Sequence, residues 1–139
     1  MKNVVILIAG LSGLTISANA QQLTASKVPS PVKASFAKAH PELKSVVWEK
    51  EKVNYEAGFK LDGKEISELY DAKGMLTESE VAIKPEELPA AVRSYIASHY
   101  KGLKIKEAAK ITKSTGVVTY EAELNGKDVI FDAKGNPMK

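Results

Sequence analysis

Length and composition describe a small globular protein. The chain has 139 residues, of which 44% are apolar and 27% charged, and this balance excludes intrinsic disorder. It has no cysteine, so packing alone must stabilise it. The formal net charge of +3, without a run of Lys or Arg, is too small to indicate nucleic-acid binding.

The first twenty residues have the pattern of a secretory signal peptide. Lys2 precedes the apolar stretch Val4–Leu14, and Ala18 and Ala20 are the small residues of a cleavage site. A membrane anchor is the weaker interpretation, because a span needs about 20 apolar residues. We therefore expect residues 1–20 to be removed after Ala20. The product is expected to be periplasmic or secreted, with no stable membrane anchor.

A polar leader and a short helix follow. Residues 21–27 are predicted to form a loose leader. Ser30 is a good N-cap and Pro31 suits the first helical position. His40 ends the helix, since the residue before a proline avoids helical backbone angles. The apolar face of this helix is predicted to comprise Val32, Phe36 and Ala39.

Several strands are predicted next. After a first strand at residues 45–50, Val53–Leu61 alternates, and the residues predicted on one face are Val53, Tyr55, Ala57, Phe59 and Leu61. Asp62-Gly63 is typical of a type I′ hairpin turn. Asp71–Gly74 fits a type I turn with a glycine bulge. A fourth strand is predicted at residues 75–83, and residues 84–87 form a linker.

The second half repeats the first. A helix is predicted from Leu88 to Tyr100, with Val92, Ile96 and Tyr100 at helical spacing. Asn125-Gly126 then matches the first hairpin turn, and Phe131–Gly135 repeats the Asp-Ala-Lys-Gly word of the second. Similar words in the same order predict an α+β protein of two tandem repeats, residues 28–83 and 88–139. Each repeat is a helix packed on one face of an antiparallel meander.

These residues resemble the repeat of the PepSY-like, β-lactamase-inhibitor-like family of small exported bacterial proteins. The second copy departs from the pattern, with Lys101 and Ala108 where the first has proline and tryptophan. The resemblance implies two helix-on-sheet units in a periplasmic or secreted setting. The wider relatives include propeptide domains that bind peptidases, and a β-lactamase inhibitor has a similar tandem fold. The matching marks in the first copy are Pro29, Pro41, Trp48, Tyr55-Glu56-Ala57, Asp62-Gly63, Asp71 and Gly74.

No catalytic set is apparent in the sequence. His40 and His99 both lie at helix ends, where a cation suits the helix dipole, so structural roles are favoured. Motifs for metal or phosphate are missing, so no metal or cofactor is expected. Trp48, within an apolar run, is predicted to be a core residue. We therefore do not expect an enzyme.

The predicted function is that of a non-enzymatic module that binds a protein partner in the cell envelope. Such a module could inhibit or modulate an envelope or secreted enzyme, such as a peptidase. The alternative is a carrier of a small lipid or peptide ligand, with its pocket between helix and sheet. Glu56 and Glu121 are expected to point away from the helices. With the hairpin tips, the candidate partner-binding residues are Glu56, Asp62, Gly63, Glu121, Asn125 and Gly126.

Overall fold

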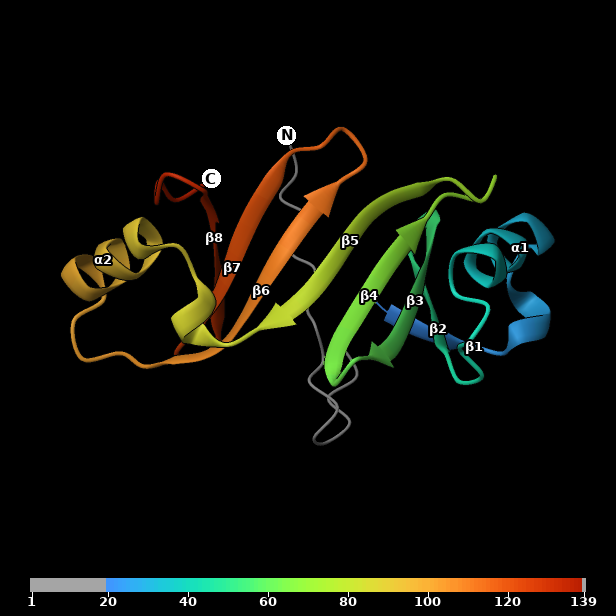
Figure 1. Ribbon diagram of the computed structural model, residues 1–139, viewed down its shortest axis with the longest axis horizontal. Coiled ribbons are helices and arrows are strands. Elements are labelled where there is room, and N and C mark those ends of the chain that lie inside the picture. The colour runs from blue at the N-terminus through green and yellow to red at the C-terminus, as the bar shows by residue number, and fades with distance from the viewer. Residues whose placement is uncertain (1–19, 139) are drawn as a thin grey trace. The chain divides into compact units, whose positions relative to one another are not determined.

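The structure is a computed structural model that describes residues 20–138 (Figure 1). Nearly all of the predicted signal peptide lies outside these described residues. The chain divides between Ser79 and Glu80 into two compact units. We describe the N-terminal unit (residues 20–79) and the C-terminal unit (residues 80–138) separately.

One order of elements occurs twice along the described chain: a strand, a 3₁₀ turn, a helix and three strands. The first series is β1 Ala20–Leu23, η1 Ala25–Lys27, α1 Ser30–Ala39, β2 Val47–Glu51, β3 Asn54–Leu61 and β4 Lys64–Tyr70. The second is β5 Leu76–Ile83, η2 Pro85–Glu87, α2 Ala90–His99, β6 Ile105–Lys113, β7 Val118–Leu124 and β8 Lys127–Asp132. Within each unit, strands that follow one another along the chain pair antiparallel: β1–β2–β3–β4 in the N-terminal unit and β6–β7–β8 in the C-terminal unit.

The predicted loose leader is wrong. Its first part belongs to β1, which pairs antiparallel with β2 so that Leu23 lies opposite Trp48. Leu23 packs against the core, and this one apolar contact anchors an otherwise polar strand. The predicted linker is also regular. It forms η2, where the Glu87 carboxylate accepts a hydrogen bond from the Lys84 backbone N–H at 2.7 Å.

The predicted N-cap is displaced by one residue. Pro29 holds the N-cap position and Ser30 begins α1 without a side-chain capping bond. The apolar face is narrower than expected, because Val32 and Phe36 are buried whereas Ala39 is exposed. His40 is the C-cap residue, at the predicted end of the helix.

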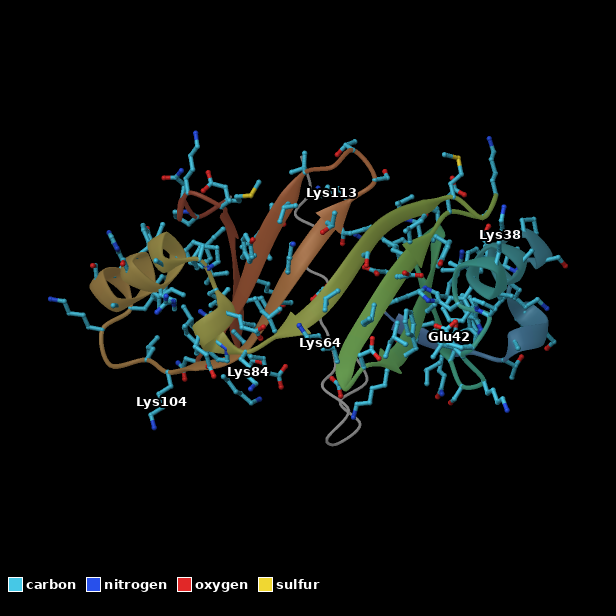
Figure 2. All side chains as sticks on the ribbon, in the orientation of Figure 1. Lys38, Glu42, Lys64, Lys84, Lys104 and Lys113 are labelled. Carbon is cyan, nitrogen blue, oxygen red and sulfur yellow. The ribbon has the colours of Figure 1, made fainter. Side chains whose placement is uncertain are left out.

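The core of the N-terminal unit lies between α1 and one face of β2–β4. Val32 and Phe36 meet Trp48, Ala57, Phe59 and Tyr70, which confirms the core position of Trp48 and the predicted alternation from Tyr55 onward. Val53, predicted on the same face, is 76% exposed because it lies in the β2–β3 turn before β3 begins. The Phe36 ring lies edge-on to Trp48 at 5.4 Å and to Phe59 at 5.3 Å. Side chains crowd the space beside α1 (Figure 2). Burial of each large apolar side chain contributes about 1.5–3 kcal/mol.

The C-terminal unit has a matching core under α2. Val92 and Ile96 pack with Ala122, Leu124 and Phe131 among others. Ala108 lies opposite Ala122, as Trp48 lies opposite Ala57 in the N-terminal unit. The two cores therefore share a register and differ in the size of the side chain at this position.

Both predicted type I′ turns are confirmed. Asp62 and Gly63 have φ of 51° and 76°, and Asn125 and Gly126 have φ of 52° and 74°. A type I′ turn needs positive φ at both central residues, and Asn, Asp and Gly reach it most readily. All four residues are exposed.

The two Asp-Ala-Lys-Gly turns hold the sheet against the helices. In the first, the Asp71 carboxylate accepts hydrogen bonds from the backbone N–H groups of Lys73 at 2.9 Å and Met75 at 3.0 Å. Gly74 has φ of 84°, as the predicted glycine bulge requires. It also approaches the first turn of α1 so closely that a Cβ would lie 2.5 Å from the Pro31 carbonyl oxygen. The glycine thus serves both the turn and the helix contact.

None of the helices formed by residues 20–138 has the length and apolar composition needed to cross a membrane.

Candidate functional site

The face of the N-terminal sheet opposite α1 carries carboxylates. We call this side of β2–β4 the open face. In β2 and β3, side chains alternate, so Glu49, Glu51 and Glu56 point away from the core residues Trp48 and Ala57. The core under α1 accounts for only one of the two sheet faces of this unit.

The register brings two of these acids into direct opposition. Glu49 is the cross-strand partner of Glu56. Glu56 in turn accepts a hydrogen bond from the hydroxyl of Ser67 on β4. Like charges directly opposite one another destabilise a sheet, so this pair works against folding when both residues are ionised.

Burial and mutual repulsion perturb these acids. Burial is the main cause that raises the pKa of Glu56, and the charges of Glu51, Glu49 and Glu78 raise it further, while the Ser67 hydrogen bond lowers it. Burial likewise raises the pKa of Glu51, with a lowering effect of Lys52 and a raising effect of Glu49. The open face therefore resists full ionisation.

The corresponding face of the C-terminal unit is different. Glu121, expected to be exposed, is only 6% exposed, and its cross-strand partner is Ala109 rather than an acid. Thr119, on the same face, lies opposite Ile111 and is also buried. Apolar residues of β6 thus lie opposite the β7 positions that alternation alone assigned to solvent.

The six residues predicted to bind a partner do not form one site. Asp62 and Gly63 are exposed at the β3–β4 tip, six positions along the strand from Glu56 and hence roughly 20 Å away. Asn125 and Gly126 are exposed at the β7–β8 tip, whereas Glu121 is buried. Of the six, Glu56 lies in a cluster of acids.

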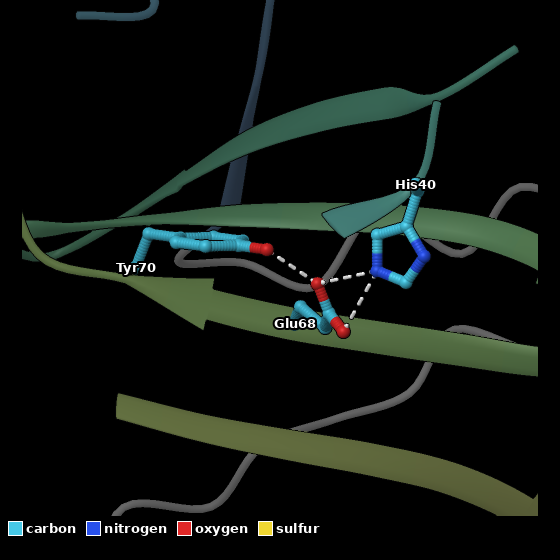
Figure 3. A network of polar contacts seen from close by, with 3 residues as sticks. All are labelled: His40, Glu68 and Tyr70. Carbon is cyan, nitrogen blue, oxygen red and sulfur yellow. Dashed lines mark hydrogen bonds and ion pairs between the residues drawn. The ribbon is translucent and has the colours of Figure 1, made fainter. Parts of the chain in front are cut away.

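A polar network that the sequence did not reveal lies under α1 (Figure 3). His40 Nε2 lies 3.0 and 3.1 Å from the two carboxylate oxygens of Glu68. The Tyr70 hydroxyl donates a hydrogen bond to the same carboxylate at 2.5 Å. The His40 ring also packs against Phe36 and Phe59, with centroids 5.0 and 4.6 Å apart.

Strand register explains why this acid is buried. Glu68 is the cross-strand partner of Ala57, so it faces α1 together with Tyr70. Burial is the main cause that raises the pKa of Tyr70, and the hydrogen bond and charge of Glu68 add to it. The alternation of Ile66, Glu68 and Tyr70 was the available sequence signal, but it does not name the partner on the helix.

The C-terminal unit has no such network at the equivalent positions. Its helix C-cap is Tyr100, the partner of Ala122 is Val129, and Phe131 is opposite Tyr120. In the C-terminal unit, packing alone therefore holds the end of the helix against the sheet. The other histidine, His99, is exposed, and its Nδ1 lies 3.0 Å from the Tyr95 carbonyl oxygen. Its contacts within α2 agree with the structural role predicted for it.

A family model matches the chain twice. It is described as "Putative beta-lactamase-inhibitor-like, PepSY-like", and it matches residues 14–78 and 61–139. No curated protein matches the chain significantly.

Three solved structures have the same fold. A DUF2874 family protein from Bacteroides uniformis has a TM-score of 0.73 and 18% identity, covering 80% of this chain and 86% of its own. A protein from Bacteroides eggerthii, described as "putative periplasmic", has a TM-score of 0.74 and 17% identity, covering 81% and 86%. A BLIP-like protein from Bacteroides fragilis has a TM-score of 0.64 and 22% identity, covering 80% and 84%. At these identities the likeness shows the fold alone.

Proposed function

Because the chain belongs to the PepSY-like, β-lactamase-inhibitor-like family, we propose that it is a non-enzymatic protein-binding module. The observation that carries this proposal is the open face. Its polar side chains lie on the sheet surface that α1 does not cover, and two of them form a pair that disfavours folding. Residues kept at a cost in stability are common at functional sites.

The module acts outside the cytoplasm in this proposal. The predicted signal peptide and cleavage after Ala20 support export to the periplasm or medium. The description of the Bacteroides eggerthii relative agrees with such a setting. The target is then an envelope or secreted enzyme, such as a peptidase, whose activity the module inhibits or modulates.

We also propose that the chain is a tandem duplication. The recurring element order, the two family matches and the equivalent register pairs support it. In this proposal β5 is the counterpart of β1, so the repeats are residues 20–75 and 76–138 rather than 28–83 and 88–139. An experimental structure would test the boundaries by superposition. Failure of one series to superimpose on the other would refute the duplication.

A carrier function is the second candidate, and the packing gives it little support. A ligand would need room between helix and sheet. In the N-terminal unit that space holds Phe36 and Phe59, whose rings lie 5.3 Å apart. Lipid or peptide extracts could raise the melting temperature of the protein while affinity capture finds no protein partner. That pair of results would rank the carrier function above protein binding.

The test is affinity capture with the mature chain from Gln21 onward. Immobilised protein is exposed to envelope extract, and a protein of similar size and charge serves as the control bait. We expect the bait to retain an enzyme, and free mature chain should displace this enzyme from the bait. The purified mature chain should bind the same enzyme and inhibit or activate it. Retention of nothing above the control, across several salt concentrations, would refute protein binding.

A further inference from the structure

The tip of the β7–β8 hairpin carries a chemically labile pair of residues. Asn125 and Gly126 are both exposed. The strand pairing closes at Leu124 and Lys127, so the two tip residues lie outside the ladder. Asparagine is among the thermally labile residues of proteins. The tip therefore presents a side-chain amide next to a backbone N–H that has no side chain of its own to shield it.

The other asparagines of the mature chain lack such a neighbour. Residues 21–139 contain three asparagines: Asn54, Asn125 and Asn136. Asn54 begins β3 and is followed by Tyr55, whose side chain restricts rotation of the backbone. Asn136 is followed by Pro137, which has no backbone N–H. Asn125 is thus the asparagine whose amide a following backbone nitrogen can attack most freely.

Gly126 gives the tip the freedom that such an attack requires. Glycine passes between positive and negative φ at little cost, and exposed loop tips open more easily than paired strands. A Cβ at Gly126 would meet no atom within 4 Å, so no neighbouring group crowds this nitrogen. The turn can therefore leave its native angles while the paired strands stay in place.

We propose that Asn125 is a site of spontaneous deamidation, through a cyclic imide formed with Gly126. The Gly126 nitrogen bonds to Cγ of Asn125, and its proton goes to the side-chain amide, which leaves as ammonia. Water then opens the imide. Cleavage between Cγ and the nitrogen gives aspartate, and cleavage between the main-chain carbonyl carbon and the nitrogen gives isoaspartate. The reaction needs only the chain and water, and it goes beyond the proposed function because it requires no partner.

The N-terminal unit shows that the aspartate product fits this turn. Its equivalent tip is Asp62-Gly63, with φ of 51° and 76°, against 52° and 74° at Asn125-Gly126. Isoaspartate does not fit, because its Cβ joins the main chain and lengthens a turn that has only two central residues. The two products therefore differ in their effect on the hairpin.

The charges beside the two tips also differ. At the N-terminal tip, Lys60 pairs with Glu65 across the strands, at 3.7 Å. At the C-terminal tip, the equivalent positions hold two opposed acids, Glu123 and Asp128. A neutral Asn125 thus adjoins a pair of like charges, and deamidation adds another carboxylate beside them. Like charges destabilise a sheet, so the product hairpin is the less stable one.

The test follows the mature chain during prolonged incubation in mildly alkaline buffer. Peptide mapping by mass spectrometry locates each amide that has become an acid, and isoaspartate methyltransferase detects the isoaspartate form. Asn54 and Asn136 are controls within the same molecule. The matched variant is Asn125→Gly, because Gly-Gly also forms type I′ turns and carries no amide. Circular dichroism verifies that this variant folds.

We expect Asn125 to be the residue converted, to a mixture of aspartate and isoaspartate. The Asn125→Gly variant should keep its mass. An Asn125 that stays intact in the folded chain would overturn the inference, whether or not a sample in urea is converted. Equal conversion of Asn54, or aspartate without isoaspartate, would overturn it as well, because the reaction would then not pass through an imide with Gly126.

A second measurement tests the effect of the added charge. Burial is the main cause that raises the pKa of Asp128, and the charges of Glu123 and Glu107 raise it further. Glu123 is paired with Lys106 at 3.5 Å, yet its charge still acts on Asp128. In an NMR titration, Asn125→Asp should raise the pKa of Asp128 above that of the wild type. An unchanged pKa would overturn the predicted effect of deamidation on the hairpin.

Discussion

Two glycines in the N-terminal unit allow the helix contact to be separated from the turn. Gly63 and Gly74 both have positive φ, at 76° and 84°. A Cβ at Gly63 meets no atom within 4 Å, so Gly63→Ala should cost only the left-handed backbone strain, about 1 kcal/mol. At Gly74 a Cβ would lie 2.5 Å from the carbonyl oxygen of Pro31 and 2.8 Å from Ser35 Oγ. Backbone atoms cannot rotate away, so overpacking should add about 1–3 kcal/mol.

Urea unfolding followed by Trp48 fluorescence measures this difference. The residue is the single tryptophan of the chain and lies in the core under α1. With a denaturant slope of roughly 1–3 kcal/mol per molar, Gly74→Ala should lower the midpoint by about 1 M or more, and Gly63→Ala by about half as much. Equal midpoints for the two variants would refute the close approach of turn and helix.

The C-terminal unit offers an independent repeat of the comparison. A Cβ at Gly135 would lie 2.6 Å from the Ala91 carbonyl oxygen, whereas one at Gly126 meets nothing within 4 Å. Gly135→Ala should therefore destabilise more than Gly126→Ala. Because this unit has no tryptophan, far-ultraviolet circular dichroism, which reports the secondary structure of both units, follows the unfolding of these variants.

Three further predictions concern ionisable groups. The pKa of Glu56 is raised, so ionisation of this carboxyl destabilises the fold as the pH rises from its ordinary pKa to its raised pKa. Urea midpoints should therefore show Glu56→Gln to be more stable than the wild type at neutral pH. The two proteins should be equally stable near about pH 3. Hydrogen bonds lower the pKa of Asp132, and the largest effect comes from the Asn136 side chain. Asn136→Ala should therefore raise the pKa of Asp132 towards its ordinary value in an NMR titration. An unchanged pKa would contradict this role of the Asn136 side chain. Glu68→Val leaves His40 and a hydroxyl without their acceptor and should cost about 1–3 kcal/mol by urea unfolding. Replacing all three network residues with their C-terminal counterparts should cost less than Glu68→Val alone, and a larger loss would contradict this account.

Local patterns predicted the elements that local chemistry dictates. The strict alternation around Tyr55 and Phe59 identified the helix-facing side of β3, because burial on one face leaves a period of two. Asp62-Gly63 and Asn125-Gly126 identified their turns, because few residues tolerate the backbone angles required. These inferences needed no knowledge of distant contacts.

Features that depend on strand partners were missed. β1 is short and mostly polar, and its pairing with β2, which places Leu23 opposite Trp48, makes it part of the sheet. Glu68 is an ordinary acid in sequence, and its burial follows from the register that places it beside His40. The burial of Glu121 depends likewise on its apolar neighbours. The acids of the open face were invisible as a cluster because they come from separate strands.

The position of Ala20 in β1 has a consequence for the order of assembly. Ala20 pairs with Glu51, and the bond predicted to be cleaved after export follows this residue directly. Proteases cut exposed, extended chain, so a paired β1 would protect the bond. If maturation occurs there, processing must precede the docking of β1. The outermost strand then joins the N-terminal sheet last, and the new amino terminus at Gln21 arrives beside β2 bearing a positive charge of its own.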